Sequence, residues 1–395
     1  MNDRIEKIIS AFQHHFSSKP MLVRSPGRAN LIGDHTDYNN GFVLPAAIDQ
    51  SIIMAISPNR LHKVRAVALD VENQHFEADI SGAISPSELG WPNYLLGVIH
   101  VFNQMNLPMT GFDCVFAGTI PIGAGLSSSA ALEGAVIFGL DQLLDLNLTR
   151  IEIAKLGQQV EHQFVGVNCG IMDQFANLYG KKKYVIRLDC KNLEHQLIPF
   201  PDEQFSILLC DTKVHRELAG SEYNLRRQQC DEAVSYFSKI DPNVNSLRDL
   251  SFQLFEEHRK NLSPIVANRS RFVLDENERV LQGASDLENG DLESFGYKMY
   301  SSHYGLRDQY EVSCSELDIL VEATEKMPGV LGARMMGGGF GGCTINIVMK
   351  EQAEEISEQL IQVYEKKRKI TPDVYLVQTS DGTDVLPVEN FAQYE

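Results

Sequence analysis

A glycine- and serine-rich stretch at residues 121–132, Pro-Ile-Gly-Ala-Gly-Leu-Ser-Ser-Ser-Ala-Ala-Leu, most constrains how this chain can fold. The apolar run at residues 112–117 predicts a strand before it, and helical periodicity follows it over about residues 128–145. Gly123 and Gly125 let the backbone turn tightly and approach a ligand closely. Because a helix N-terminus presents free N–H groups, this strand, loop and helix are typical of an anion-binding site. The same pattern also fits a capped junction that binds nothing.

The length and the charge of the chain limit what it can bind. With 395 residues, of which 43% are hydrophobic, the chain exceeds the usual size of a single domain, and we expect two lobes. The 53 acidic residues outnumber the 35 basic ones and give a formal net charge of −18. This charge repels polyanions, so we expect small-molecule partners and neither nucleic acid nor an anionic membrane.

The cysteines and the first residues indicate the compartment. The seven cysteines are scattered, odd in number and without a Cys-x-x-Cys pair, which favours neither a zinc site nor a disulfide framework. Residues 1–12 are charged and amphipathic, unlike a signal peptide, and no apolar run reaches transmembrane length. We therefore expect a cytoplasmic chain, and we expect it to be a monomer.

Hydrophobic patterns outline the remaining elements. Helical spacing predicts helices over residues 3–16, 91–106, 128–145, 150–165, 221–238, 246–256, 269–287, 291–307, 313–325 and 352–367. Apolar runs predict strands at residues 21–24, 42–48, 51–56, 64–69, 75–80, 112–117, 184–189, 205–210, 344–349 and 374–378. Residues 25–27, Ser-Pro-Gly, are expected to end the first strand, and residues 42–48 and 51–56 to pair with each other. We expect a boundary between lobes near residues 180–200.

Two further stretches concentrate unusual chemistry. Residues 28–41 gather hydrogen-bonding side chains around a glycine, Gly33, a density suited to binding a polyol. These side chains are Arg28, Asp34, His35, Thr36 and Asp37. Residues 335–343, Met-Met-Gly-Gly-Gly-Phe-Gly-Gly-Cys, permit positive φ angles and close approach to a neighbouring loop or ligand. The alternative is a tight turn before the strand at residues 344–349, and the two interpretations are compatible.

The three motifs, in this order and spacing, resemble those of the GHMP small-molecule kinases. Residues 27–39, Gly-Arg-Ala-Asn-Leu-Ile-Gly-Asp-His-Thr-Asp-Tyr-Asn, are similar to the galactokinase signature of that family. Further matching stretches lie at residues 169–174, 221–230 and 306–317. The resemblance implies a bilobal α+β fold with the active site in the cleft between the lobes. It implies a ribosomal-protein-like N-terminal lobe at residues 1–190 and a ferredoxin-like C-terminal lobe at residues 191–395.

The resemblance also implies the reaction, transfer of the γ-phosphoryl group of MgATP to the anomeric hydroxyl of α-D-galactose. Asp173 matches the catalytic aspartate, which accepts the proton of that hydroxyl, and Arg28 matches the arginine beside it. A nearby guanidinium keeps a carboxylate ionised and can stabilise transition-state charge. Taken alone, Asp173 could simply be the N-cap of its helix.

ATP and Mg²⁺ are the implied cosubstrate and metal. The implied ATP loop comprises Gly123, Ala124, Gly125, Leu126, Ser127, Ser128 and Ser129. The chain has no G-x-x-x-x-G-K-[ST] sequence, so this loop lacks the usual lysine. The family motif places Mg²⁺ on Ser129 and Glu161, and a hydroxyl with one carboxylate suits a hard cation that keeps several waters.

The implied sugar contacts include one departure from the family pattern. The matching positions are Asp34, His35, Thr36, Asp37, Gly170 and Tyr223. Galactokinases usually carry Glu where this chain has Asp34, so its contact with the sugar can be direct, water-bridged or absent. For His35 and Tyr223 considered singly, a structural role is the simpler interpretation.

Two alternatives stay open at this stage. A catalytically silent sensor of galactose and ATP would share the fold, although the uninterrupted Gly/Ser motif and the presence of both Arg28 and Asp173 favour an enzyme. A related sugar 1-kinase with another acceptor is the second alternative, and it rests on Asp34.

Overall fold

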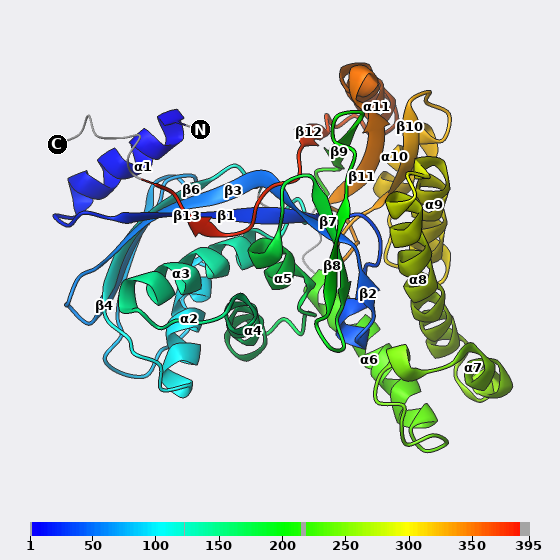
Figure 1. The fold of residues 1–395 in the computed structure, drawn as a ribbon, viewed down its shortest axis with the longest axis horizontal. Helices are drawn as coiled ribbons and strands as arrows, with labels where there is room; N and C mark the ends of the chain where they lie inside the picture. The colour runs from blue at the N-terminus through cyan, green and yellow to red at the C-terminus, as the bar shows by residue number, and fades with distance from the viewer. Residues whose placement is uncertain (1, 122, 215–218, 388–395) are drawn as a thin grey trace.

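The computed structural model describes residues 2–121, 123–214 and 219–387 of the chain (Figure 1). Its first sheet has six strands in the order β13-β1-β3-β6-β4-β5, and all neighbours are antiparallel except β4 and β6. In chain order these strands are β1 (Met21–Asn30), β3 (Pro45–Pro58), β4 (Lys63–Ala68), β5 (Gln74–Asp79), β6 (Phe112–Gly118) and β13 (Asp384–Val385). The last strand of the chain therefore lies beside the first.

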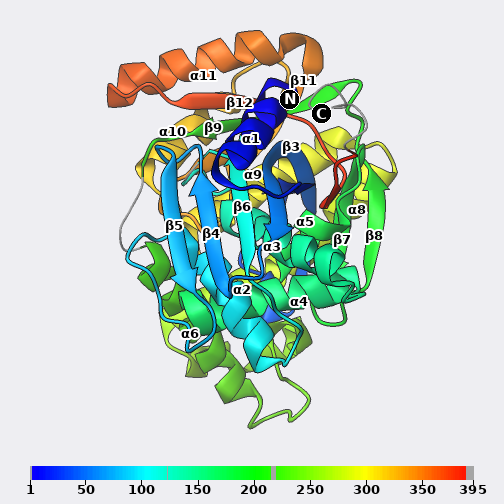
Figure 2. The same ribbon diagram turned by 90° about the vertical axis from the view of Figure 1, so that its left-hand side faces the viewer.

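Helices cover both faces of this sheet (Figures 1 and 2). One face carries α2 (Pro92–Gln104), α3 (Ser128–Leu144), α4 (Arg150–Val160) and α5 (Met172–Tyr179), and the other carries α1 (Asn2–His15). The alternation along β3 matches this arrangement: Ile52 and Met54 lie in the core beneath α3, whereas Ile53 packs with Ile8 and Phe12 of α1. Burial of both faces explains why β3 reads as a nearly continuous apolar run.

A second sheet of four antiparallel strands has the order β10-β11-β9-β12. The strands are β9 (Phe205–Asp211), β10 (Val330–Met335), β11 (Cys343–Met349) and β12 (Asp373–Val377). The helices of this half are α6 (Ala219–Phe237), α7 (Phe252–His258), α8 (Pro264–Glu288), α9 (Leu292–Asp308), α10 (Ser315–Thr324) and α11 (Ala353–Arg368). A small sheet of β2 (Phe42–Val43), β7 (Tyr184–Asp189) and β8 (His195–Pro199) lies between the two halves (Figure 1).

Most predicted elements are present, but four expectations are wrong. β1 does not end at residues 25–27, because a bulge between Pro26 and Arg28 absorbs the proline and the strand continues to Asn30. Residues 42–48 and 51–56 do not pair with each other, since β3 runs unbroken from Pro45 to Pro58 between β1 and β6.

The other two concern helices. The helix expected over residues 150–165 changes to a π-helical turn at Glu161–Val165. The helix expected at residues 246–256 is a short 3₁₀ turn, Leu247–Asp249, followed by α7. Further 3₁₀ turns span Asp37–Asn39, Arg259–Asn261 and Lys350–Gln352.

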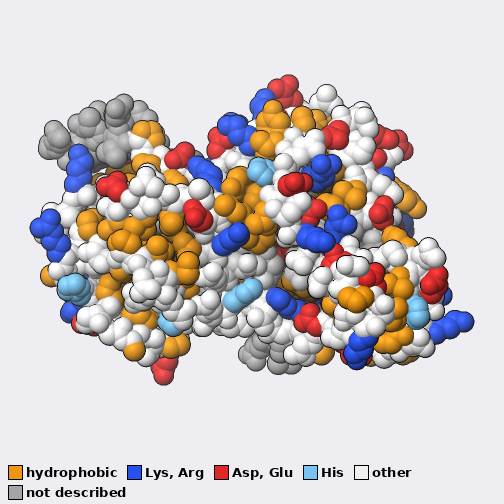
Figure 3. Space-filling view, turned by 60° about the horizontal axis from the view of Figure 1, so that its bottom comes forward, with side chains coloured by type: hydrophobic (Ala, Val, Ile, Leu, Met, Phe, Trp, Pro, Cys, Tyr) orange, Lys and Arg blue, Asp and Glu red, His pale blue; other side chains and the backbone are white. Residues whose placement is uncertain are grey.

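The surface shows two bulky halves with an indentation between them (Figure 3). The expected combination of helices with separate, largely antiparallel sheets is present. The division at residue 190 stays a prediction. Among the described residues we find no helix with the length and apolar character that crossing a membrane requires.

Candidate active site

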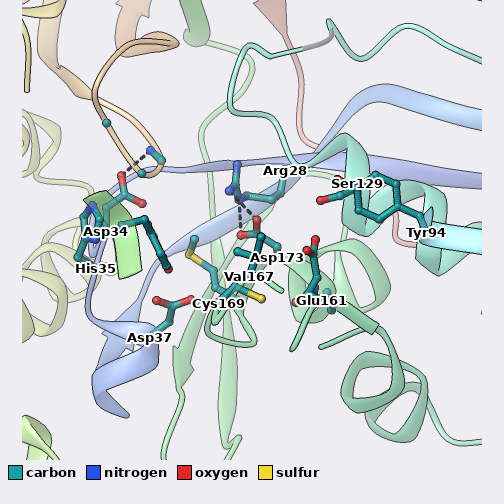
Figure 4. Close-up of a pocket in the computed structure, with 16 residues that line it drawn as sticks. Arg28, Asp34, His35, Asp37, Tyr94, Ser129, Glu161, Val167, Cys169 and Asp173 are labelled. Atoms are coloured by element: carbon teal, nitrogen blue, oxygen red, sulfur yellow. Dashed lines mark hydrogen bonds and ion pairs between the residues drawn. The ribbon is translucent and has the colours of Figure 1, made fainter. Parts of the chain in front are cut away.

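A cavity of about 370 Å³ opens where the two halves meet, within the roughly 300–1,000 Å³ typical of small-molecule sites. Its walls come from β1, the loop after β1, α2, α3, the π-helical turn and the loop that follows it, α5, α6 and the link between β10 and β11 (Figure 4). The lining residues are Arg28, Asp34, His35, Asp37, Tyr94, Ser129, Glu161, Val167, Cys169, Met172, Asp173, Gln174, Tyr223, Gly337, Gly338 and Gly339.

Arg28 and Asp173 form a bidentate ion pair at the centre of this cavity (Figure 4). Arg28 donates from Nε to Asp173 Oδ1 at 2.7 Å and from Nη2 to Oδ2 at 2.8 Å. The burial of Arg28 opposes its charge, but the carboxylates of Asp173, Asp34 and Asp37 together outweigh this effect and raise the pKa of Arg28. Asp173 lies in the first turn of α5, whose N-cap residue is Ile171, so the interpretation of Asp173 as an N-cap is wrong.

Ser127 connects the Gly/Ser loop to this pair. Its backbone adopts the left-handed conformation (φ 59°, ψ 49°), which is uncommon for a residue other than glycine. The hydroxyl does not cap α3, as the sequence suggested, but donates to Asp173 Oδ2. Arg28 also donates from Nη1 to the carbonyl of Gly125 at 2.6 Å. The loop and the ion pair therefore form one hydrogen-bonded unit.

The rest of the Gly/Ser loop lies against the third motif. Gly123 and Gly125 have φ angles of 79° and 74°, which glycine adopts without strain. A Cβ on Gly337 would lie 3.6 Å from the Gly125 carbonyl oxygen, so the two glycine-rich segments are close neighbours. Between the glycines, Ala124 and Leu126 are buried, and Ser128 is the first residue of α3.

The loop after β1 contributes three acidic or basic side chains to the cavity. Asp34 accepts hydrogen bonds from Asn30 Nδ2 at 2.7 Å, Arg334 Nη2 at 2.5 Å and Gly337 N at 2.9 Å. Asp34 and Arg334 are both buried, at 2% and 0% exposure, so their ion pair ties this loop to β10. The carboxylate of Asp34 is thus largely occupied by protein donors.

His35 and Asp37 have more room for a ligand. Burial lowers the pKa of His35 to about 4, so its imidazole is neutral, and Nε2 has no hydrogen-bond partner among the described residues. Burial raises the pKa of Asp37 to about 7, and the neighbouring Asp173 carboxylate adds to the effect. Gly170 lies directly against the Asp37 carboxylate, where any side chain would collide with it. The ring centroid of Tyr223 lies 5.3 Å from that of His35.

Two predicted sugar contacts do not line the cavity. The Thr36 side chain is fully buried, and its hydroxyl faces the carbonyls of Gly33 and Phe42 at 2.7 and 2.6 Å. It holds the loop closed. Gly170 makes space for Asp37 and is itself absent from the lining.

Ser129 and Glu161 face each other at the end of the cavity beside Tyr94 (Figure 4). Burial raises the pKa of Glu161 to about 7, against the opposing effect of a hydrogen bond from the Ser129 hydroxyl. Within the described residues, no three His, Cys, Asp or Glu side chains converge on one point. One hydroxyl and one carboxylate at an open cavity nevertheless fit Mg²⁺, which prefers oxygen ligands and keeps several waters.

Comparisons with known proteins agree with these motifs. The galactokinase galactose-binding signature matches residues 10–58, and models of the N-terminal and C-terminal domains of GHMP kinases match residues 93–181 and 284–366. A galactokinase of Roseiflexus sp. (strain RS-1) is 40% identical over 373 residues, which cover 94% of each chain. The chain belongs to the galactokinase family of GHMP kinases. Members of this family are ATP-dependent sugar kinases.

Solved structures confirm the family's fold for this chain. Lactococcus lactis galactokinase complexed with galactose superposes with a TM-score of 0.93 at 34% identity, covering 97% of this chain and 100% of that one. Mevalonate kinase of Methanococcus jannaschii shares the fold, with a TM-score of 0.66 at 20% identity over 92% and 99% of the two chains. The bilobal α+β fold expected of this galactokinase-family chain is therefore confirmed.

Several contacts in and around the cavity of this galactokinase-family chain were missed by sequence reasoning. Arg334 lies one residue before the third motif, but nothing in the sequence pairs it with Asp34. The bond from Ser127 to Asp173 depends on a left-handed backbone that a Gly-Leu-Ser pattern does not specify. Tyr94 lies in the first turn of the helix predicted at residues 91–106, where nothing in the sequence assigns it to the cavity.

Proposed function

We propose that the chain is a galactokinase, which transfers the γ-phosphoryl group of ATP to the anomeric hydroxyl of α-D-galactose and gives galactose 1-phosphate and ADP. The observation that carries this proposal is the Arg28–Asp173 pair at the centre of the cavity, which is hydrogen-bonded to the Gly/Ser loop. A loop that cradles phosphates is thereby joined to a carboxylate that can receive a proton. An enzyme catalyses phosphoryl transfer mainly by positioning the two substrates and stabilising charge, and it need not form a covalent bond to either.

Asp173 is proposed to take the proton of the anomeric hydroxyl as the oxygen forms its bond to phosphorus and the bond to ADP breaks. Oδ2 already receives bonds from Arg28 and Ser127, whereas Oδ1 receives one from Arg28. Oδ1 therefore keeps acceptor capacity for the hydroxyl. Arg28 is fixed on the strand β1 and is placed to stabilise charge on the transferred phosphoryl group.

The sugar is proposed to bind among His35, Asp37 and Tyr223, with Gly170 leaving space for Asp37. Buried polar groups of this kind reject an epimer strongly, because the epimer leaves one of them unpaired. We propose that Asp34 and Thr36 shape the loop, since protein groups already occupy their oxygens. This departs from the expectation that both bind the sugar.

The ATP phosphates are proposed to lie on the backbone N–H groups of the loop from Gly123 to Ser129. Ser129 and Glu161 are the residues that would hold Mg²⁺, with water completing its shell. The metal, when bound, would neutralise phosphate charge. We further propose a cytoplasmic monomer, because all seven cysteines are unpaired and one chain supplies every group named here.

An ADP-release assay with purified protein tests the activity. Galactose, glucose, N-acetylgalactosamine, galacturonate and arabinose should each be offered with MgATP, and we expect ADP only with galactose. ADP with another sugar and none with galactose would identify a different sugar 1-kinase. Binding of galactose without ADP would identify a sensor.

The role of Asp173 is tested by Asp173→Asn, which keeps the shape and removes the charge. We expect kcat to fall by about 10²–10⁴-fold, the usual range for a lost proton acceptor, while galactose still binds in a calorimeter. A kcat close to that of the unchanged enzyme would remove Asp173 from this role.

A further inference from the structure

A chain of buried polar groups runs from His35 away from the cavity. His35 Nδ1 lies 2.9 Å from the Tyr38 hydroxyl, which lies 2.7 Å from the Tyr310 hydroxyl. The Tyr310 hydroxyl in turn lies 3.2 Å from Cys230 Sγ, and Asn39 Nδ2 donates to the same sulfur at 3.6 Å. A ring nitrogen at the cavity is thus connected, through two phenols, to a thiol on α6.

Every member of this chain is neutral at physiological pH. Burial lowers the pKa of His35 and raises those of Tyr38 and Tyr310. Burial also raises the pKa of the Cys230 thiol to about 11. Each hydroxyl and the thiol therefore has one proton to donate, and the imidazole has one proton on one of its two nitrogens. All the bonds in the chain must then run in the same direction, either toward His35 or away from it.

Relative acidity favours the direction toward His35. A phenol O–H is a stronger donor than the N–H of a neutral imidazole, and the imidazole lone pair is a stronger acceptor than a phenol oxygen. Tyr38 then donates to Nδ1, Tyr310 donates to Tyr38, and Cys230 donates to Tyr310. The proton of the ring is left on Nε2.

The surroundings of Nε2 support the same assignment. The backbone of Gly338 favours the protonated ring of His35, although it forms no hydrogen bond of normal geometry with Nε2. Nε2 is buried and has no hydrogen-bond partner among the described residues, and His35 lines the cavity. An N–H on this nitrogen would therefore be available to a ligand.

The hydroxyl of Tyr310 is itself fixed in place. Arg226 of α6 donates from Nε to the backbone carbonyl of Tyr310 at 2.9 Å, and the ring of Phe272 lies 4.8 Å from that of Tyr310. The Tyr310 and His35 rings are 4.9 Å apart. These contacts hold the backbone and the ring of Tyr310 beside His35.

We propose that Tyr38, Tyr310 and Cys230 are positioning residues that hold His35 as its Nε2–H tautomer, so that His35 offers the sugar a hydrogen-bond donor. This rests on the proposed function, because it assigns the sugar to His35. It implies that the sugar oxygen facing Nε2 is recognised as an acceptor. Cys230 of α6 and Tyr310, which follows α9, would then determine the tautomer of a histidine in the loop after β1, from the other half of the molecule.

The tautomer can be measured directly by long-range ¹⁵N–¹H correlation spectra of enzyme labelled at its 11 histidines. His35→Gln identifies the His35 signals. We expect Nε2–H in the unchanged enzyme and a mixture of tautomers in Tyr38→Phe. Tyr310→Phe should shift the populations less but in the same direction, and Cys230→Ser, which keeps a donor, should not shift them.

Kinetics provide the functional readout. We expect Tyr38→Phe to raise KM for galactose about threefold to tenfold, the effect of one weakened neutral hydrogen bond, with kcat and KM for ATP within about twofold. Tyr300→Phe is the matched control, because it removes a hydroxyl that bonds to Thr324 Oγ1 at 3.0 Å outside the cavity lining. It should leave both the tautomer and the KM for galactose unchanged.

Two results would overturn the proposal. One is an Nδ1–H signal for His35 in the unchanged enzyme, and the other is a Tyr38→Phe enzyme with the original tautomer and KM. If Tyr38→Phe fails to fold, Tyr310→Phe decides by the same two measurements. Failure of the proposed function is distinguishable, since it would show as no ADP from galactose while the tautomer could still be read.

Discussion

At the scale of single residues, Asp37 makes galactose binding dependent on pH. Burial, reinforced by Asp173, raises its pKa to about 7, and an ionised carboxylate accepts hydroxyl hydrogen bonds better than a neutral acid. We expect 1/KM for galactose to increase between pH 6 and pH 8 as Asp37 loses its proton. Steady-state kinetics across this range provide the measurement. Asp37→Asn should raise KM and abolish the slope, and a slope that survives in the variant would assign it to another group.

The same shift predicts how stability depends on pH. The pKa of Asp37 is about 7 in the folded chain against its ordinary value of 3.8, so between these two pH values the folded state holds a proton that the unfolded state has lost. The free energy of unfolding should therefore decrease as pH rises from about 4 to about 7, by at most about 1.4 kcal/mol per pH unit from this group. Urea titrations at pH 5 and pH 8 should show a larger loss for the unchanged chain than for Asp37→Asn. Equal losses would exclude Asp37 as the source.

Asp34 is expected to matter for the stability of the fold as well as for the shape of the loop after β1. Asp34→Asn leaves the fully buried Arg334 guanidinium without its counter-charge, which costs about 3–5 kcal/mol in comparable buried pairs. Denaturant unfolding should show this loss. Glu203→Gln is the control, because it breaks an exposed pair with Lys183 and should leave stability unchanged. Asp34→Glu should keep activity with an altered KM for galactose, since a longer side chain cannot keep all three present bonds.

The residues found from sequence were those whose motif specifies them. Arg28, Glu161 and Asp173 lie on the cavity as the family pattern implies. The partners that hold them were not found, because a hydrogen bond such as Ser127 to Asp173 depends on backbone angles and on a contact between residues 46 positions apart. Thr36 illustrates the opposite error: its place between two cavity residues suggested a ligand, whereas its side chain points into the loop.

At the scale of elements, α8 holds both ends of the loop after β1, residues 31–42, which we call the sugar loop. Glu276 accepts a hydrogen bond from Gly33 N at 3.0 Å, and Asn277 Oδ1 accepts one from Phe42 N at 2.8 Å. Both acceptors are buried on a helix of the C-terminal half, whereas the loop follows β1. This connection explains how a loop from one half keeps its shape against the other.

Asn277→Ala tests this connection. The variant leaves a buried backbone N–H unpaired, which costs about 1–3 kcal/mol, and frees one end of the loop. We expect faster hydrogen exchange in residues 31–42 and a higher KM for galactose, with KM for ATP unchanged. Asn289→Ala, at an exposed helix end, is the control. Unchanged exchange in the loop would contradict the role of Asn277.

The elements that were predicted wrongly are those that depend on contacts between residues distant in the sequence. Predicting β1 as a short strand failed because Pro26 is tolerated only through a bulge, which the pairing with β3 determines. The unbroken β3 could not be separated from a hairpin, since Asp49 and Gln50 look like a turn when their neighbours are unknown. The π-helical turn places Glu161 at the cavity, and such turns depend on local packing that periodicity does not report.

At the scale of the whole molecule, the C-terminal segment closes the structure by returning to the N-terminal half. β13 pairs with β1, and Thr383 lies fully buried between β1 and α5. Its hydroxyl lies 3.0 Å from Ser25 Oγ and 2.7 Å from Asn177 Oδ1. Asn177 in turn donates from Nδ2 to the carbonyl of Pro26 at 2.6 Å, beside the bulge that places Arg28. Thr383 is thus linked to the elements that carry both members of the Arg28–Asp173 pair, since Ser25 and Arg28 share β1 and Asn177 and Asp173 share α5.

Thr383→Val tests whether this closure supports the active site. Valine keeps the shape of threonine but leaves Asn177 Oδ1 without its buried donor, whereas Ser25 Oγ still accepts a hydrogen bond from Asn177 Nδ2, so the free energy of unfolding should fall by about 1–3 kcal/mol. We also expect kcat to fall severalfold with KM for galactose little changed, because α5 positions Asp173 rather than the sugar loop. Thr371→Val, which removes an exposed hydroxyl bonded to Glu365, is the matched control and should alter neither quantity. A loss of stability without any change in kcat would mean that the closure holds the fold together but does not position Asp173.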